Sequence, residues 1–226
     1  ALPLPRHPVK MEAKPLLQAC GNGASELMSN ISGSIVAMVY NFQLLALLGE
    51  DGVSAYGVMM YVCFFFVAIF VGYSIGSSPI SYHYGAENRG ELQNMFRKSG
   101  LLMFLLGIAM SLSAIALAKP LAKLFVGYDE ALYNLTWQGF RLYSLAFLFT
   151  GLNIFASSLF TALNNGTVSA AISFMRTLVF QIGAVLVLPA MAGVTGLWLA
   201  TFAAEGCALA VSLIFTLVNR KKYGYY

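Results

Sequence analysis

Three long segments in the first half of the chain contain neither a charged residue nor a histidine. They are residues 27–49, 52–82 and 99–118. A helix needs about 20 apolar residues to cross the roughly 30 Å hydrocarbon core of a bilayer, and each segment reaches that length. Only 10% of the 226 residues are charged, whereas soluble domains carry about a quarter to keep their surfaces solvated. The sequence therefore predicts an integral membrane protein.

The polar breaks between apolar segments predict an all-α integral membrane fold of six transmembrane helices. The six spans are expected at about 25–48, 53–80, 100–118, 142–163, 167–188 and 194–218. A short amphipathic helix is expected over 91–98, before the third span. Residues 1–20 are predicted to be a cytoplasmic linker, 21–219 the six-helix bundle and 220–226 a cytoplasmic tail. If Met11 is a start codon, the chain would instead be a half-size product.

The distribution of basic residues predicts the orientation of the spans. With a cytoplasmic N-terminus, one side of the membrane receives Arg6, Lys10, Lys14, Arg89, Arg97, Lys98, Arg220, Lys221 and Lys222. The other side receives Lys119, Lys123 and Arg141, together with Glu50, Asp51, Asp129 and Glu130. Cytoplasmic loops carry an excess of Lys and Arg. Both termini are therefore expected in the cytoplasm.

Arg176 and Glu205 are the two charges that the sequence places inside the membrane. At 1.5 Å per residue they lie about 14 and about 20 Å from the cytoplasmic ends of the fifth and sixth spans. An unpaired charge at this depth costs at least about 2.5–3.5 kcal/mol, so the two are expected to pair. The pair is either a proton or cation site at Glu205 tuned by Arg176, or a salt bridge that only locks two helices. Trp198, near the start of the sixth span, is expected to anchor the membrane interface.

Five other polar residues are candidates for a cavity or an ion path. Glu26 begins the first span, where it either lines a cavity mouth or caps the helix N-terminus. Asn41, Gln43, Asn153 and Gln181 are uncharged hydrogen-bonding groups at membrane depth. Each either lines a substrate path or bonds across a helix interface. As a set they indicate that one face of the bundle does not contact lipid.

Several function classes are disfavoured by what the sequence lacks. There is no P-loop for a nucleotide and no H-E-x-x-H or G-x-S-x-G motif, so neither catalysis nor a catalytic residue is expected. Three scattered cysteines make neither a disulfide framework nor a metal site. The net charge of +4 lies in loops, not on one solvated face, which disfavours nucleic-acid binding. No cofactor is expected, and an ion gradient would have to drive any transport.

Four motifs occur along the chain in a characteristic order. They are Asn22-Gly23-Ala24-Ser25-Glu26 at the first span, Tyr84-Gly85-Ala86-Glu87-Asn88 before an amphipathic helix, Ser173-Phe174-Met175-Arg176 followed by Leu188-Pro189, and Gly196-Leu197-Trp198 leading to Ala204-Glu205. Their order and loop placement resemble the C-terminal half of transporters of the multidrug and toxic compound extrusion (MATE) family. The resemblance covers nearly the whole chain from Gly21 onward.

The resemblance implies two six-helix lobes around a cavity of alternating access, with H⁺ or Na⁺ exchanged for small organic cations. This chain would be the second lobe in the bacterial inner membrane. Its partners would be membrane lipid and an N-terminal six-helix half, in the same or a separate chain, or a second copy of itself. Some members carry a carboxylate deep in the seventh span and an aspartate in the tenth. Here those positions fall at Asn41, Gln43 and near Thr150, which puts a sodium site of that type in doubt.

Two alternatives to drug efflux remain open. One is a related lipid-linked saccharide flippase, which would be expected to have a cationic cavity. The sequence places few basic residues at membrane depth, which favours a drug exporter. The other is a non-transporting membrane scaffold or fragment. An upstream homologous six-span half in the same reading frame would disfavour the scaffold.

Overall fold

The computed structural model describes residues 13–77 and 79–225, apart from several side chains between residues 14 and 29, including that of Glu26. Residues 1–12 of the predicted linker lie outside this part of the chain. All regular elements in the described residues are helical, which confirms the all-α part of the predicted fold class. In order they are α1 (Ala13–Gly76), α2 (Pro79–Gly85), α3 (Arg89–Val126), α4 (Glu130–Tyr143), the short 3₁₀ helix η1 (Ser144–Ala146), α5 (Phe147–Ala162), α6 (Gly166–Phe174), the π-helix η2 (Met175–Phe180) and α7 (Gln181–Tyr223).

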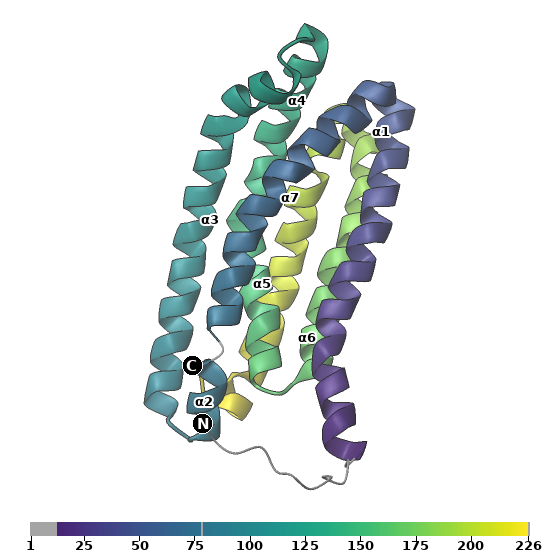
Figure 1. Ribbon diagram of the computed structural model, residues 1–226. Coiled ribbons are helices and arrows are strands. Elements are labelled where there is room, and N and C mark those ends of the chain that lie inside the picture. The colour runs from purple at the N-terminus through teal and green to yellow at the C-terminus, as the bar shows by residue number, and fades with distance from the viewer. Residues whose placement is uncertain (1–12, 78, 226) are drawn as a thin grey trace, which may run out of the picture.

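Four stretches of the described chain are long and apolar enough to cross a membrane. They are Asn30–Gly85, Arg89–Val126, Glu130–Ala162 and Gly166–Tyr223. Two of them reverse direction. Figure 1 shows α1 running up one side, turning at the top and descending, and the α6–α7 stretch doing the same behind it.

Both reversals occur at a glycine with positive φ. Gly49 has φ 66° and ψ −152°, and Gly193 has φ 56° and ψ −138° after the non-helical Ala192. Glycine adopts this backbone conformation readily, whereas a Cβ disfavours it. The two reversals lie close to the predicted breaks between the first and second spans and between the fifth and sixth.

Several predicted helix boundaries are wrong. The amphipathic helix at 91–98 and the third span form the single helix α3, which continues through Pro120 to Val126. Proline removes one backbone hydrogen bond, but ending the helix in an apolar setting would leave several backbone groups unsatisfied. At the N-terminus, α1 begins at Ala13, so the last residues of the predicted linker are helical.

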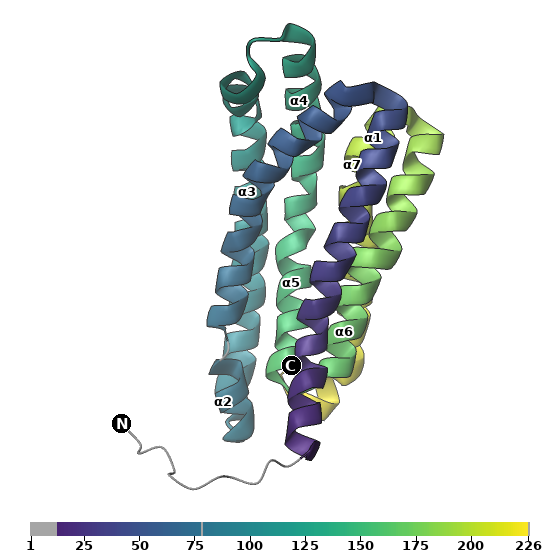
Figure 2. The ribbon, with the colours of Figure 1, turned by 45° about the vertical axis from the view of Figure 1, so that its right-hand side comes forward.

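The helices pack as a bundle whose interior is lined by several elements. α1 contacts α5 and α6, α3 contacts α4 and α5, and α7 contacts η2 and α5. Figures 1 and 2 agree that the first arm of α1 lies beside α6. The two arms of α1 meet where Tyr40 stacks on Tyr56, with ring centroids 4.8 Å apart. The outer surface carries exposed apolar side chains such as Phe64, Phe65 and Leu124, as expected of a surface that contacts lipid.

Candidate functional site

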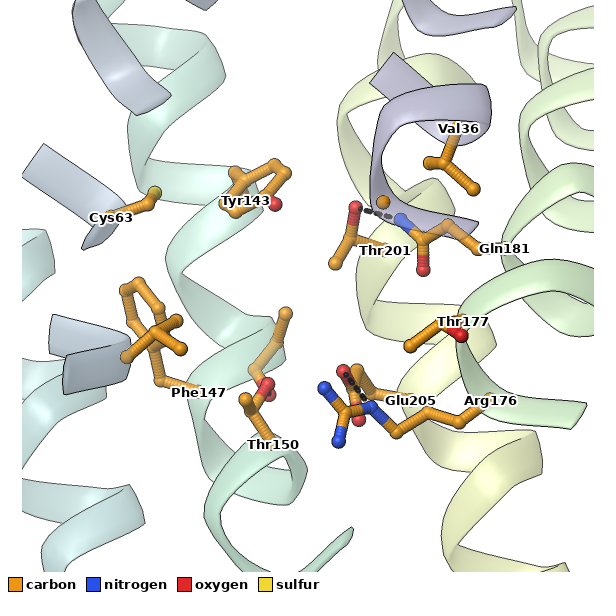
Figure 3. A pocket seen from close by; sticks show the side chains of 13 residues that line it. Val36, Cys63, Tyr143, Phe147, Thr150, Arg176, Thr177, Gln181, Thr201 and Glu205 are labelled. Carbon is orange, nitrogen blue, oxygen red and sulfur yellow. Dashed lines mark hydrogen bonds and ion pairs between the residues drawn. The ribbon is translucent and has the colours of Figure 1, made fainter. Parts of the chain in front are cut away.

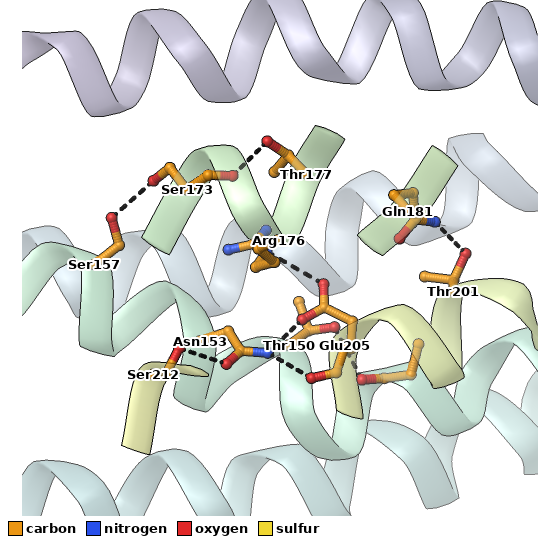
Figure 4. A network of polar contacts seen from close by, with 11 residues as sticks. Thr150, Asn153, Ser157, Ser173, Arg176, Thr177, Gln181, Thr201, Glu205 and Ser212 are labelled. Carbon is orange, nitrogen blue, oxygen red and sulfur yellow. Dashed lines mark hydrogen bonds and ion pairs between the residues drawn. The ribbon is translucent and has the colours of Figure 1, made fainter. Parts of the chain in front are cut away.

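The π-helix η2 fixes which side chains of this stretch face α7. In an α-helix the residue one turn beyond Arg176 on the same face would be Phe180. In η2 the hydrogen bonds run between residues five apart. Gln181, and not Phe180, therefore lies one turn beyond Arg176 on the same helix face. Arg176 and Gln181 therefore both point toward α7, where Glu205 and Thr201 lie one ordinary turn apart (Figure 4).

Arg176 and Glu205 are brought together at the centre of the bundle. Arg176 Nε lies 3.3 Å from Glu205 Oε1, and the two side chains are 17% and 8% exposed. Arg176 Nε has no hydrogen-bond partner among the described residues, so its N–H is poorly aligned with the carboxylate. The contact is thus an ion pair without the directional bond that would make it strong.

The second carboxylate oxygen of Glu205 is held by Asn153. The Asn153 amide Nδ2 donates to Glu205 Oε2 at 2.7 Å and to the backbone carbonyl of Glu205 at 2.9 Å. Ser212 donates in turn to Asn153 Oδ1 at 3.0 Å. This chain of contacts joins α5 to α7 and is fully buried (Figure 4). Both oxygens of Glu205 are therefore engaged.

Two adjoining cavities meet at Arg176. The smaller, about 180 Å³, is lined by Tyr143, Phe147, Thr150 and Glu205 among others (Figure 3). The larger, about 560 Å³, is lined by residues that include Ser157 and Ser173. Figure 3 shows the two terminal nitrogens of the Arg176 guanidinium on the side of the ion pair that faces Thr150. Within the described residues these nitrogens have no hydrogen-bond or ion-pair partner.

A ladder of hydroxyl groups borders the larger cavity between α5 and α6. Ser157 Oγ lies 2.9 Å from both Ser169 Oγ and Ser173 Oγ, and Thr161 Oγ1 lies 2.7 Å from Ser169 Oγ. The four-residue spacings of Ser157 with Thr161 and of Ser169 with Ser173 place each pair on one helix face. That spacing was the sequence signal that could have identified the ladder.

A second polar cluster closes the other end of the smaller cavity. Gln181 Nε2 donates to Thr201 Oγ1 at 2.7 Å, and Thr201 Oγ1 lies 2.9 Å from the Tyr40 hydroxyl. Tyr40 also donates to the Leu197 carbonyl at 3.1 Å. The hydroxyls of Tyr40 and Thr201 were missed at the sequence level because tyrosine and threonine are common in membrane helices.

Not all of the predicted polar residues join this network. Asn41 is exposed and borders a separate hollow of about 410 Å³ with Glu50 on α1. Gln43 is partly buried and lines neither central cavity. The side chain of Glu26 lies outside the described residues.

The prediction that Trp198 anchors the interface is wrong. It is 2% exposed, and a Cβ on Gly139 would lie 2.8 Å from its ring, because α4 and α7 pack closely there.

In the part of the chain that the structure describes, no three His, Cys, Asp or Glu side chains are grouped to hold a metal ion. The site is an ionic and hydroxyl-rich network inside an apolar helical bundle. It thus has the character of a multi-pass membrane protein with a polar interior, the class to which many transporters belong.

A profile of the MatE family matches residues 26–186, most of the chain. The chain therefore belongs to the MATE family, whose members are transporters. No curated protein sequence matches it significantly.

The fold matches solved MATE structures closely despite low sequence identity. A crystal structure of MATE in complex with MaL6 superposes with a TM-score of 0.87 at 18% identity, over 96% of this chain and 49% of that one. An outward-facing multidrug resistance MATE family transporter gives 0.85 at 18% identity, over 96% and 49%. A MOP superfamily transporter from Pyrococcus furiosus, described as having reversed polarity in its binding pocket, gives 0.79 at 18%, over 94% and 48%. The chain spans about half the length of these structures and resembles one half of a MATE transporter.

Proposed function

We propose that this chain is the C-terminal six-helix lobe of a secondary active multidrug efflux transporter of the bacterial inner membrane. It would exchange H⁺ or Na⁺ for organic cations. The family match and the half-length superposition support this proposal. Four apolar stretches, two of them reversing at a glycine, support the proposed six crossings. An even number of crossings would put both termini on one side of the membrane, which we propose is the cytoplasmic side.

The observation that carries the proposal is the Arg176–Glu205 pair at the wall of a cavity. A purely structural pair is best stabilised when every donor and acceptor is satisfied. Here the carboxylate is held by Asn153, while most donors of the guanidinium face open space. Binding of a proton or cation at Glu205 would neutralise the partner of Arg176 and change the charge that the cavity presents. Ion and substrate binding would then be coupled through one shared group.

Efflux measurements with a matched carboxylate control test this role. The chain would be co-expressed with a six-helix N-terminal half in cells that lack their own efflux pumps, and ethidium export would be followed by fluorescence. Glu205→Gln is expected to abolish most of the export that an ion gradient drives. Glu130→Gln, an exposed acid in the first turn of α4, is expected to leave it unchanged. Selective collapse of the proton or sodium gradient identifies the coupling ion. Unchanged export by Glu205→Gln at equal expression would contradict the role.

Transport of a lipid-linked saccharide is the second candidate, and one specific observation favours it. Arg176 lines both central cavities, whereas Glu205 lines only the smaller one and has both carboxylate oxygens engaged. A cationic cavity suits the phosphate groups of such a substrate. A soluble phosphate-bearing analogue that inhibits ethidium export in wild type but not in Arg176→Gln would favour the flippase. If neither ethidium nor the analogue is transported or bound, the chain is a non-transporting scaffold.

A further inference from the structure

Another polar cavity lies at the end of the bundle where α2, the start of α3 and the end of α7 meet. Its volume is about 350 Å³, and it is lined by His83, Tyr84, Gly85, Glu87, Arg89, Leu92, Lys222 and Tyr223. Figure 1 shows α2 and the C-terminal end of the chain together at the bottom of the molecule, far from the turn between the arms of α1. The cavity is thus separate from the network around Arg176.

The charged groups around this cavity are not neutralised by one another. Within the described residues, neither Arg89 nor Lys222 forms a salt bridge. Lys222 Nζ lies 5.0 Å from the centre of the Tyr223 ring. Two cations face one carboxylate, Glu87, so the lining is net positive. The Nδ1 atom of His83 is buried and has no hydrogen-bond partner among the described residues, which leaves a polar atom that a ligand can satisfy.

The C-terminal residues hold these groups in place. Gly224 has φ 71° and its carbonyl accepts a hydrogen bond from Gln93 Nε2 at 3.2 Å. A Cβ on Gly224 would lie 3.6 Å from Arg89 Nε, so the arginine packs directly on this turn. Tyr223 is buried and receives a hydrogen bond from Asn165 Nδ2 at 2.9 Å. The cavity wall is therefore built from segments that are distant in the sequence.

An apolar surface leads from the membrane-spanning part of α7 to this cavity. Ile214, Val218 and Lys222 are four residues apart and share one helix face. Ile214 is 58% and Val218 73% exposed, so this face is open to lipid. Tyr82 of α2 is also exposed, as is common for tyrosine at the level of the headgroups.

We propose that this cavity binds the phosphate group of an anionic phospholipid from the surrounding bilayer. Arg89 would contact the phosphate oxygens through its planar fork and Lys222 as a point charge. An acyl chain of the same lipid would lie along Ile214 and Val218. Basic pockets between the ends of membrane helices bind anionic headgroups in this way. The apolar face that ends at Lys222 favours a lipid over free phosphate as the source.

The test measures retention of fluorescent phosphatidylglycerol by the purified chain in a neutral detergent, with phosphatidylcholine and inorganic phosphate as competitors. Arg89→Gln with Lys222→Gln is the test variant. Arg97→Gln with Lys98→Gln removes the same charge from exposed positions of α3 that do not line the cavity. We expect retention to fall roughly fivefold for each cavity charge removed, and to stay near the wild-type value in the control.

Glu87→Gln keeps the proposal testable if the double variant folds poorly. This change removes the opposing carboxylate from the cavity, so retention should rise a few-fold, whereas damage to the fold could only lower it. An equal loss in both double variants would mean diffuse attraction to basic loops and would overturn the proposal. Displacement by inorganic phosphate but not by phosphatidylcholine would identify free phosphate as the ligand and would also overturn it. So would unchanged retention in Glu87→Gln.

Discussion

At the scale of single residues, the pairing of Arg176 with Glu205 determines how much stability a substitution at either position costs. Removing one partner leaves the other charge buried without compensation, which costs about 3–5 kcal/mol, whereas removing both is often close to neutral. Asn153 would lose its contact with Glu205 Oε2 when Glu205 is replaced, but keeps its bond to the backbone carbonyl of residue 205. The pair therefore behaves as one unit.

We accordingly expect Arg176→Met alone to destabilise the chain more than Arg176→Met combined with Glu205→Leu. The unfolding temperature in detergent and the monodisperse fraction on size-exclusion chromatography provide the measurement. Asn41→Leu is the matched control, because Asn41 is exposed and contributes to neither cavity. Equal stability of the single and double variants would show that the two charges do not depend on each other.

The sequence was sufficient to predict that Arg176 and Glu205 lie at similar depth, since helix rise and the short connection between the spans determine it. It was not sufficient for Gln181 and Thr201. Their contact depends on the π-helix η2, and no residue pattern specifies that local change in winding. Trp198 was misassigned for a related reason. Its burial depends on Gly139, which is distant in the sequence and allows α4 to approach.

At the scale of helices, two glycines set the positions where the chain turns back. Gly49 and Gly193 combine positive φ with ψ near −150° and −140°, a region that costs about 1–3 kcal/mol for residues with a Cβ. A Cβ at either position would meet no atom within 4 Å. The penalty for substitution is thus conformational and not steric.

Gly49→Ala and Gly193→Ala are each expected to destabilise the chain by about 1–3 kcal/mol. Gly57→Ala is the control, because Gly57 lies inside a regular part of α1 and also has open space around its Cα. Alanine favours a helix over glycine by about 1 kcal/mol, so this variant should be neutral or slightly stabilised. Apparent unfolding temperatures in one detergent compare the three. A loss in Gly57→Ala as large as in Gly49→Ala would argue against the conformational explanation.

The positions of the turns were predictable from the polar breaks between apolar segments, but the lengths of the helices were not. The break expected between the spans at 142–163 and 167–188 is confirmed, and there Asn165 caps α6 by accepting a hydrogen bond from the Val168 N–H. In contrast, α3 extends past Pro120 because the membrane environment favours unbroken backbone hydrogen bonding. Whether a helix continues past a proline thus depends on the environment around the chain, and the residue pattern does not encode that environment.

At the scale of the whole molecule, the proposed six crossings place alternate turns on opposite sides of the membrane. Tyr128 lies in the turn between α3 and α4 and is 84% exposed, whereas Lys221 lies at the opposite end near the C-terminus. Single cysteines at these positions would report the orientation, in a background without Cys20, Cys63 and Cys207.

A membrane-impermeant maleimide is expected to label Tyr128→Cys in intact cells, and Lys221→Cys only after the cells are permeabilised. Cytoplasmic loops carry the excess of basic residues, which predicts this result. Labelling is read from the mass shift of the protein on a denaturing gel. Labelling of both positions from outside would exclude the proposed topology, and the reverse pattern would invert it.

The π-helix has a consequence for how this stretch tolerates length changes. Its extra residue per turn shifts the phase of everything that follows by about 100° relative to an uninterrupted α-helix. Deleting one residue between Arg176 and Gln181 would remove that extra residue, and a regular α-helix would then place Gln181 four positions after Arg176, on the face that still points toward Thr201. A one-residue deletion here would therefore remove the π-helix and preserve the coupling between the two ends of the interior network, whereas α-helical winding at the present length would rotate Gln181 away from Thr201.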